Sequence, residues 1–134
     1  MKRMLVNLTA LAMLIAVAGC DSTKAPGAAR PDPLSEAQYP QVTAEGGLEG
    51  ELTAGKPSIV PGPPMLVSVP VRLAGNREAN VQYRFTFLDE QNQPMQPEAE
   101  WQYRRLPARA QVYLMGTAPD EGATDWRLRI RPAR

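Results

Sequence analysis

Apolar and polar residues alternate along three segments of the chain, 67–73, 81–87 and 126–131. The first two segments carry apolar residues at their odd positions, and the third alternates apolar residues with arginine at every step. Successive side chains of a β-strand point to opposite faces. The alternation therefore predicts three strands, each with one buried face and one solvated face.

Other apolar runs are short and are separated by glycine, proline and asparagine. They cover 48–52, 58–60, 101–106 and 110–115. Such short runs, spaced about ten residues apart, predict an all-β sandwich or barrel. A proline followed by acidic residues can begin one helical turn at 97–101, but we favour an irregular lead-in to a strand there.

The segment 65–73 contains Pro70. Proline cannot donate a hydrogen bond to a neighbouring strand, so we expect this segment at a sheet edge or bulged at that point. The apolar faces of all the expected strands predict one small core. Its members are Val67, Val69, Val71, Val81, Tyr83, Phe85, Phe87, Trp101, Val112, Leu114, Trp126, Leu128 and Ile130.

The N-terminal pattern is that of a secretory signal. Lys2 and Arg3 precede an apolar stretch over 4–17, and small residues lead into Cys20. A cysteine at the cleavage point resembles the lipobox of bacterial lipoproteins. That resemblance implies cleavage before Cys20 and a diacylglycerol on its thiol. A spanning helix needs about 20 apolar residues, so we expect a lipid anchor and no membrane span.

This reading divides the chain into three regions: a cleaved signal peptide over 1–19, a flexible tether rich in proline and alanine over 20–40, and a β-sandwich domain over 41–134. Alternatively, 38–42 already begins the first strand. We expect the protein in the periplasm, anchored to the outer membrane. Asp21 directly after the lipidated cysteine is a sorting residue that favours the inner membrane in enteric bacteria, so both membranes stay open.

Composition removes several kinds of chemistry. The chain has one cysteine and no histidine. It therefore lacks the residues of a Ser-His-Asp triad, a common zinc site or an internal disulfide. Acidic pairs such as Glu98 and Glu100 fall in turns or on outward positions, so we expect no catalytic residue, no enzyme, no metal and no cofactor. Loss of Lys2 and Arg3 leaves thirteen basic and fourteen acidic side chains, and this near-neutral charge argues against nucleic-acid binding.

Three segments carry a family resemblance. They are the Tyr-Arg-Phe strand and turn over 81–95, the strand with its Gly-x-Ala step over 110–118, and the closing strand over 126–130. Together with the lipobox they resemble the YcfL-like lipoproteins, over most of the expected domain. The resemblance implies a small immunoglobulin-like antiparallel β-sandwich on a periplasmic lipoprotein of Gram-negative bacteria. It implies no activity and no catalytic residue.

Two surfaces are candidates for binding. Arg84, Arg127, Arg129 and Arg131 occupy outward positions of two strands, and they form one basic stripe if those strands are neighbours. An ordinary solvated face, neutralised by Asp89, Glu90, Glu98 and Glu100, explains the same pattern. Tyr113, if exposed, suits protein contact.

The leading hypothesis from these features is a non-enzymatic protein that binds another cell-envelope protein. It would use a sheet edge, with 65–73 first, or the basic stripe second. The alternative is that the arginine-rich face binds anionic glycolipid or lipid head groups. The oligomeric state stays open.

Overall fold

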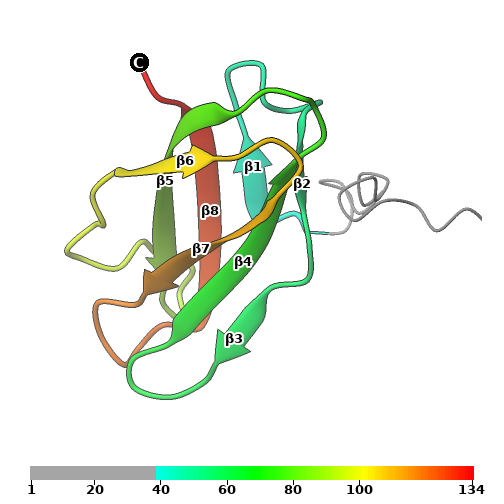
Figure 1. The fold of residues 1–134 in the computed structure, drawn as a ribbon. Coiled ribbons are helices and arrows are strands. Elements are labelled where there is room, and N and C mark those ends of the chain that lie inside the picture. Colours follow the sequence, from blue (N-terminus) through cyan, green and yellow to red (C-terminus); the bar gives the residue numbers. More distant parts are fainter. Residues whose placement is uncertain (1–38) are drawn as a thin grey trace, which may run out of the picture.

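A computed structural model describes residues 39–134 of the chain. Eight strands form two sheets that pack face to face, and the strands of one sheet cross over those of the other (Figure 1). The strands are β1 (Val42–Ala44), β2 (Leu52–Ala54), β3 (Ser58–Val60), β4 (Leu66–Leu73), β5 (Ala79–Leu88), β6 (Gln102–Leu106), β7 (Gln111–Thr117) and β8 (Asp125–Pro132). The predicted all-β sandwich is confirmed. The expected signal peptide, most of the tether, Cys20 and Asp21 lie outside the described residues.

The first sheet, sheet A, has the order β1-β8-β5-β6. Its centre is the long antiparallel pair of β5 and β8, in which Phe85 lies opposite Leu128. β1 runs parallel to β8 at one edge, so the sheet is not purely antiparallel. The second sheet, sheet B, has β4 at its centre, with β2 and β3 on one side and β7 on the other.

The core lies between the sheets, where the odd positions of β4 and β5 meet the even positions of β8. Phe85 stands at its centre, with ring centroids 6.2 Å from Tyr83, 6.1 Å from Phe87 and 6.0 Å from Trp126. The period-two prediction is confirmed on all three strands, since their apolar residues are buried and the residues between them are not. Val112 is only partly buried and packs at the margin of the core.

The prediction that 65–73 is an edge strand is wrong, because β4 pairs on both sides. Pro70 is tolerated there because β2 ends at Ala54 and β3 begins at Ser58, which leaves a gap beside Pro70. The carbonyl of Pro70 points to that gap and accepts a hydrogen bond of 2.8 Å from the Gly55 N–H. In a strand the N–H of a residue points to the same side as its carbonyl, so no strand requires the donor that proline lacks.

The prediction that Trp101 belongs to the core is also wrong. Tyr83 lies opposite Gln102 in the register of β5 and β6, so Trp101 falls beside Arg84, whose side chain points away from the core. Trp101 thus lies on the outer face of sheet A and is partly buried there. The segment 97–101 is irregular and leads into β6, as favoured over a helical turn.

The connection from β5 to β6 is built around one carboxylate. The side chain of Asp89 accepts hydrogen bonds of 2.9 Å from the backbone N–H groups of Gln91 and Gln93. Asn92 has a positive φ of 62°, a conformation that asparagine tolerates better than most residues. This folded turn carries Glu98 and Trp101 to the outer face of sheet A. Among the described residues, no helix is long and apolar enough to cross a membrane.

Candidate functional sites: an arginine-rich groove and a free edge strand

The four candidate arginines lie together on the outer face of sheet A. Arg84 of β5 is directly opposite Arg129 of β8, and Arg127 and Arg131 flank Arg129 at alternate positions of β8. The condition for one basic stripe, that the two strands be neighbours, is therefore met. Like charges directly opposite each other repel. This face consequently requires compensating groups.

Trp101 supplies the first compensation. The guanidinium carbon of Arg131 lies 3.7 Å from the centre of the Trp101 ring, that of Arg84 4.8 Å and that of Arg129 5.8 Å. A guanidinium over the face of an indole is attracted by its electron-rich π-system, by about 0.5–1 kcal/mol at exposed sites. The ring of Trp101 thus makes cation–π contacts with three arginines. The sequence predicts Trp101 in the core, because a large aromatic side chain is more often buried than used as a surface platform.

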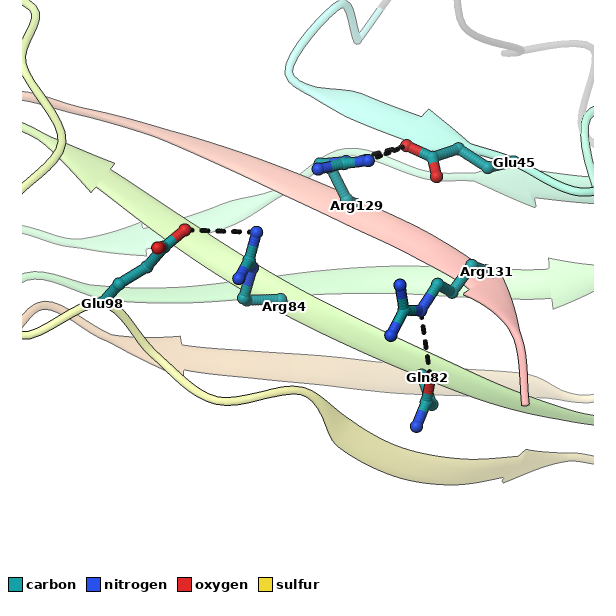
Figure 2. Close-up of polar contacts among 6 residues, drawn as sticks. All are labelled: Glu45, Gln82, Arg84, Glu98, Arg129 and Arg131. Carbon is teal, nitrogen blue, oxygen red and sulfur yellow. Dashed lines mark hydrogen bonds and ion pairs between the residues drawn. The ribbon is translucent and has the colours of Figure 1, made fainter. Parts of the chain in front are cut away.

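Carboxylates and an amide supply the second compensation. Arg84 pairs with Glu98 at 3.1 Å, Arg129 pairs with Glu45 at 2.7 Å, and Arg131 donates a hydrogen bond of 3.0 Å to Gln82 (Figure 2). Glu98 was among the acidic residues expected to neutralise the stripe. Glu45 was not, because it follows β1 and only the parallel β1–β8 pairing brings it to this face.

A groove of about 560 Å³ opens on this face, between the strands of sheet A and the turn after β5. Three arginines line it together with two carboxylates and two threonines; these are Arg84, Arg127, Arg129, Glu98, Asp125, Thr43 and Thr86. A further hollow, of about 540 Å³, lies beside Arg131 and Tyr103. Sheet A therefore presents a hollowed and charged outer surface.

Two of the arginines in the groove are incompletely satisfied. The side chain of Arg84 is only 21% exposed, and its buried Nε has no hydrogen-bond partner. A buried donor without an acceptor costs about 1–3 kcal/mol. Arg127 is exposed and takes part in none of the ion pairs found within residues 39–134. Among the described residues, the groove therefore carries one guanidinium without an ion pair, that of Arg127, beside one with a buried unsatisfied donor, that of Arg84.

Tyr113, the fifth candidate, lies on the other sheet. It belongs to β7, opposite Pro70 of β4, and points outward with 55% of its surface exposed. Met115 is on the same face of β7 and is 61% exposed. Since Leu114 between them is fully buried, β7 alternates between the core and the solvent. The structure thus separates Tyr113 from the arginines instead of joining them.

β7 is also an edge strand. In the described part of the chain it pairs with β4 on one side and with no strand on the other. Gly116 lets β7 approach sheet A closely, because a Cβ at this position would lie 2.5 Å from Cγ and Cδ2 of Phe85. The backbone of β7 is therefore held firmly on its inner face while its free edge remains open.

The buried phenol of Tyr83 links β5 to β6 through a side-chain hydrogen bond. Burial raises the pKa of the Tyr83 phenol, an effect that the charge of Arg104 partly opposes, so its hydroxyl stays protonated and donates a 2.7 Å hydrogen bond to Oε1 of Gln102. Within residues 39–134, no group of three or more aspartate, glutamate, cysteine or histidine side chains is placed to hold a metal ion.

The fold and these surfaces define a small two-sheet β-sandwich with a charged outer face on one sheet and a free edge on the other. A family model described as "Protein of unknown function (DUF1425)" matches residues 42–132, so the chain belongs to this family. No curated protein matches the chain.

Two solved structures share the fold. One is the Campylobacter jejuni protein cj0090, with 23% identity and a TM-score of 0.59, covering 69% of this chain and 98% of that one. The other is a DUF1425 family member from Shewanella sp. pv-4, with 19% identity and a TM-score of 0.53, covering 62% of this chain and 77% of that one. At these identities the likeness extends to the fold alone.

Proposed function

We propose that this protein is a non-enzymatic, lipid-anchored lipoprotein of the YcfL-like type, and that it binds another cell-envelope protein. The run of small residues ending at Cys20 supports the lipid anchor and a periplasmic location. In enteric bacteria an aspartate at position 21, directly after the lipidated cysteine, favours the inner membrane, so the proposal includes both the outer and the inner membrane. The family description states no function, so the binding role is argued from the surfaces of this chain alone.

The observation that carries this proposal is the unprotected edge of β7. Soluble proteins normally guard edge strands by keeping them short or by placing charges or proline on them. β1, β2 and β3 have three residues each, and the edge strand β6 carries Arg104 and Arg105. β7 has seven residues, Gln111–Thr117, with no charged residue and no proline. Its edge therefore lacks three common devices against pairing, namely shortness, charge and proline.

An edge of this kind binds an extended segment by adding it to the sheet. The backbone N–H and C=O groups of β7 provide the affinity, and side chains at alternate positions provide the specificity. Tyr113 and Met115 are the side chains that would contact the added strand's outward residues. We therefore expect the partner to contribute an extended, uncharged segment with apolar or aromatic residues at alternate positions.

A photo-reactive amino acid in place of Tyr113 tests this in cells that produce the full chain. Irradiation should give a covalent adduct with one envelope protein. Met115→Lys, which puts a charge on the edge, should abolish the adduct. Val60→Lys, at an equally exposed position of β3, should leave it intact.

A photo-reactive residue in place of Ser58 serves as the placement control, since β3 lies on the opposite side of β4. The proposal is refuted if no adduct forms at position 113. It is equally refuted if position 58 gives the same adduct, or if Met115→Lys leaves the adduct unchanged.

A further inference from the structure

The groove on sheet A is a second site, independent of the β7 edge. We propose that it binds a phosphate group, carried by a lipid head group or by a small soluble molecule. Its volume of about 560 Å³ lies within the range of small-molecule pockets. The proposal rests on the charge, the hydrogen-bonding state and the shape of the groove.

One guanidinium of the groove, that of Arg127, forms no ion pair within residues 39–134 and is available to an anion. Glu98 pairs with Arg84, and Glu45 pairs with Arg129, so these two arginines are held in place. Arg127, two residues along β8 from Arg129, lines the same groove without an ion pair among residues 39–134. The carboxylate of Asp125 lines the groove as well, and its Oδ1 accepts a hydrogen bond of 2.8 Å from the backbone N–H of Trp126. A phosphate here would meet one unpaired cation flanked by two arginines that are already oriented.

The burial of the Arg84 side chain and its unpartnered Nε distinguish this groove from an ordinary solvated sheet face. A solvated arginine donates its N–H groups to water, whereas Arg84 stacks on Trp101 and is mostly buried, with Nε unpartnered. Glu98 engages the terminal nitrogen Nη2, and the buried Nε is out of a ligand's reach. The remaining N–H groups of the two terminal nitrogens are the donors that a phosphate beside Arg84 would meet.

The donor set fits a phosphate better than a carboxylate. A single guanidinium satisfies both oxygens of a carboxylate, whereas a phosphate has more oxygens and accepts from several donors. Here three arginines and two threonines, Thr43 and Thr86, line one groove. Leu88, Pro40 and Pro94 line it too and offer apolar surface to the organic part of the ligand.

Trp101 provides the readout, because its ring contacts the arginines of the groove, while Trp126 is buried in the core and gives a constant background. The full chain in neutral detergent is titrated with glycerol 3-phosphate, inorganic phosphate and succinate, and tryptophan emission is recorded. Arg127→Gln tests the groove. Arg77→Gln, an exposed arginine of the β4–β5 connection, is the matched control.

We expect a saturable change in emission with both phosphates and a weaker response to succinate. Arg127→Gln should weaken phosphate binding about tenfold, the effect of losing one charge-assisted hydrogen bond. Arg77→Gln should have no effect. The lipid source is tested in bilayer discs: if phosphatidylglycerol competes with glycerol 3-phosphate, the ligand is a head group, and if it does not, the ligand is soluble.

Three results overturn the proposal: no saturable response to either phosphate, equal loss in Arg127→Gln and Arg77→Gln, or succinate binding as tightly as phosphate. The last of these assigns the groove to carboxylates, as on an acidic peptide. Met115→Lys should leave the response unchanged, so a failure of this site and a failure of the β7 interface are distinguishable.

Discussion

Substitution of Gly116 by alanine probes how β7 is held against sheet A. The new Cβ would lie 2.5 Å from Cγ and Cδ2 of Phe85 and 2.9 Å from its Cβ. Carbon atoms pack best at about 3.5–4.0 Å, so β7 and the Phe85 ring must separate by roughly 1 Å. Phe85 cannot move away freely, since Tyr83, Phe87 and Trp126 surround it.

The size of the stability loss in Gly116→Ala follows from two opposing effects. Overpacking of a tight core costs about 1–3 kcal/mol. The lower backbone entropy of alanine in the unfolded chain offsets about 0.4–1 kcal/mol of that cost. We expect Gly116→Ala to lower the free energy of unfolding by about 1.3 kcal/mol, which for a domain of this size lowers Tm by roughly 5–10 °C.

Urea unfolding followed by tryptophan fluorescence, to which Trp101 and the buried Trp126 both contribute, measures this loss. Gly75→Ala is the control, because a Cβ at Gly75 meets no atom within 4 Å and its stability should change by less than about 0.5 kcal/mol. Phe85→Leu removes part of the clash, so the double variant should lose less than the sum of the two single losses. Wild-type stability in Gly116→Ala, or strict additivity in the double variant, would refute the reasoning.

Three further substitutions test the outer face of sheet A and the interior. Trp101→Leu removes the ring that three arginines contact. It should lower the free energy of unfolding, measured in urea titrations, by about 1–2 kcal/mol with an unchanged m-value. No loss of stability would contradict the stacking. Glu98→Gln releases Arg84 from its ion pair and should tighten glycerol 3-phosphate binding in the fluorescence titration while costing less than about 1 kcal/mol of stability, whereas weaker binding would count against the site. The phenol of an unfolded tyrosine ionises near pH 10, and burial raises the pKa of Tyr83 in the folded state. The contribution of Tyr83 to the free energy of unfolding is therefore fully present below about pH 10 and is lost as the pH rises above it. Tyr83→Phe should therefore flatten the fall of unfolding free energy above about pH 10, and an unchanged slope there would exclude this cause.

The faces of the strands could be predicted from the sequence. Period-two alternation assigns Val81, Phe85 and Leu128 to the core and Arg84 and Arg129 to the solvent, because the geometry of a strand alone fixes which side chains share a face. The alternation alone therefore identifies the arginine-bearing face.

The neighbours of the strands could not be predicted in the same way. Pro70 indicated an edge, yet β4 is central, because the interruption between β2 and β3 lies beside the residue without an N–H. Glu45 joins Arg129 through pairing between the first strand and the last. Trp101 became a platform for cations only because the turn after β5 folds it onto a basic face. Each depends on contacts between distant segments, which local patterns do not encode.

The two proposed sites lie on different sheets. The groove belongs to the outer face of sheet A, and β7 is the free edge of sheet B. Charge dominates the first site and backbone hydrogen bonding the second, so the two should respond differently to salt. Binding at the groove should weaken at high ionic strength, whereas strand addition at β7 should be nearly insensitive to it.

Hydrogen exchange of the β7 backbone amides tests the central claim most directly. Every second N–H of Gln111–Thr117 points to the free edge and should exchange rapidly in the purified chain. In envelope fractions that contain the partner, these amides should exchange at least about tenfold more slowly, a protection that Met115→Lys removes, while the amides of β5 are unaffected. Equal exchange of β7 in the purified chain and in the envelope would contradict the claim that its edge binds a partner strand.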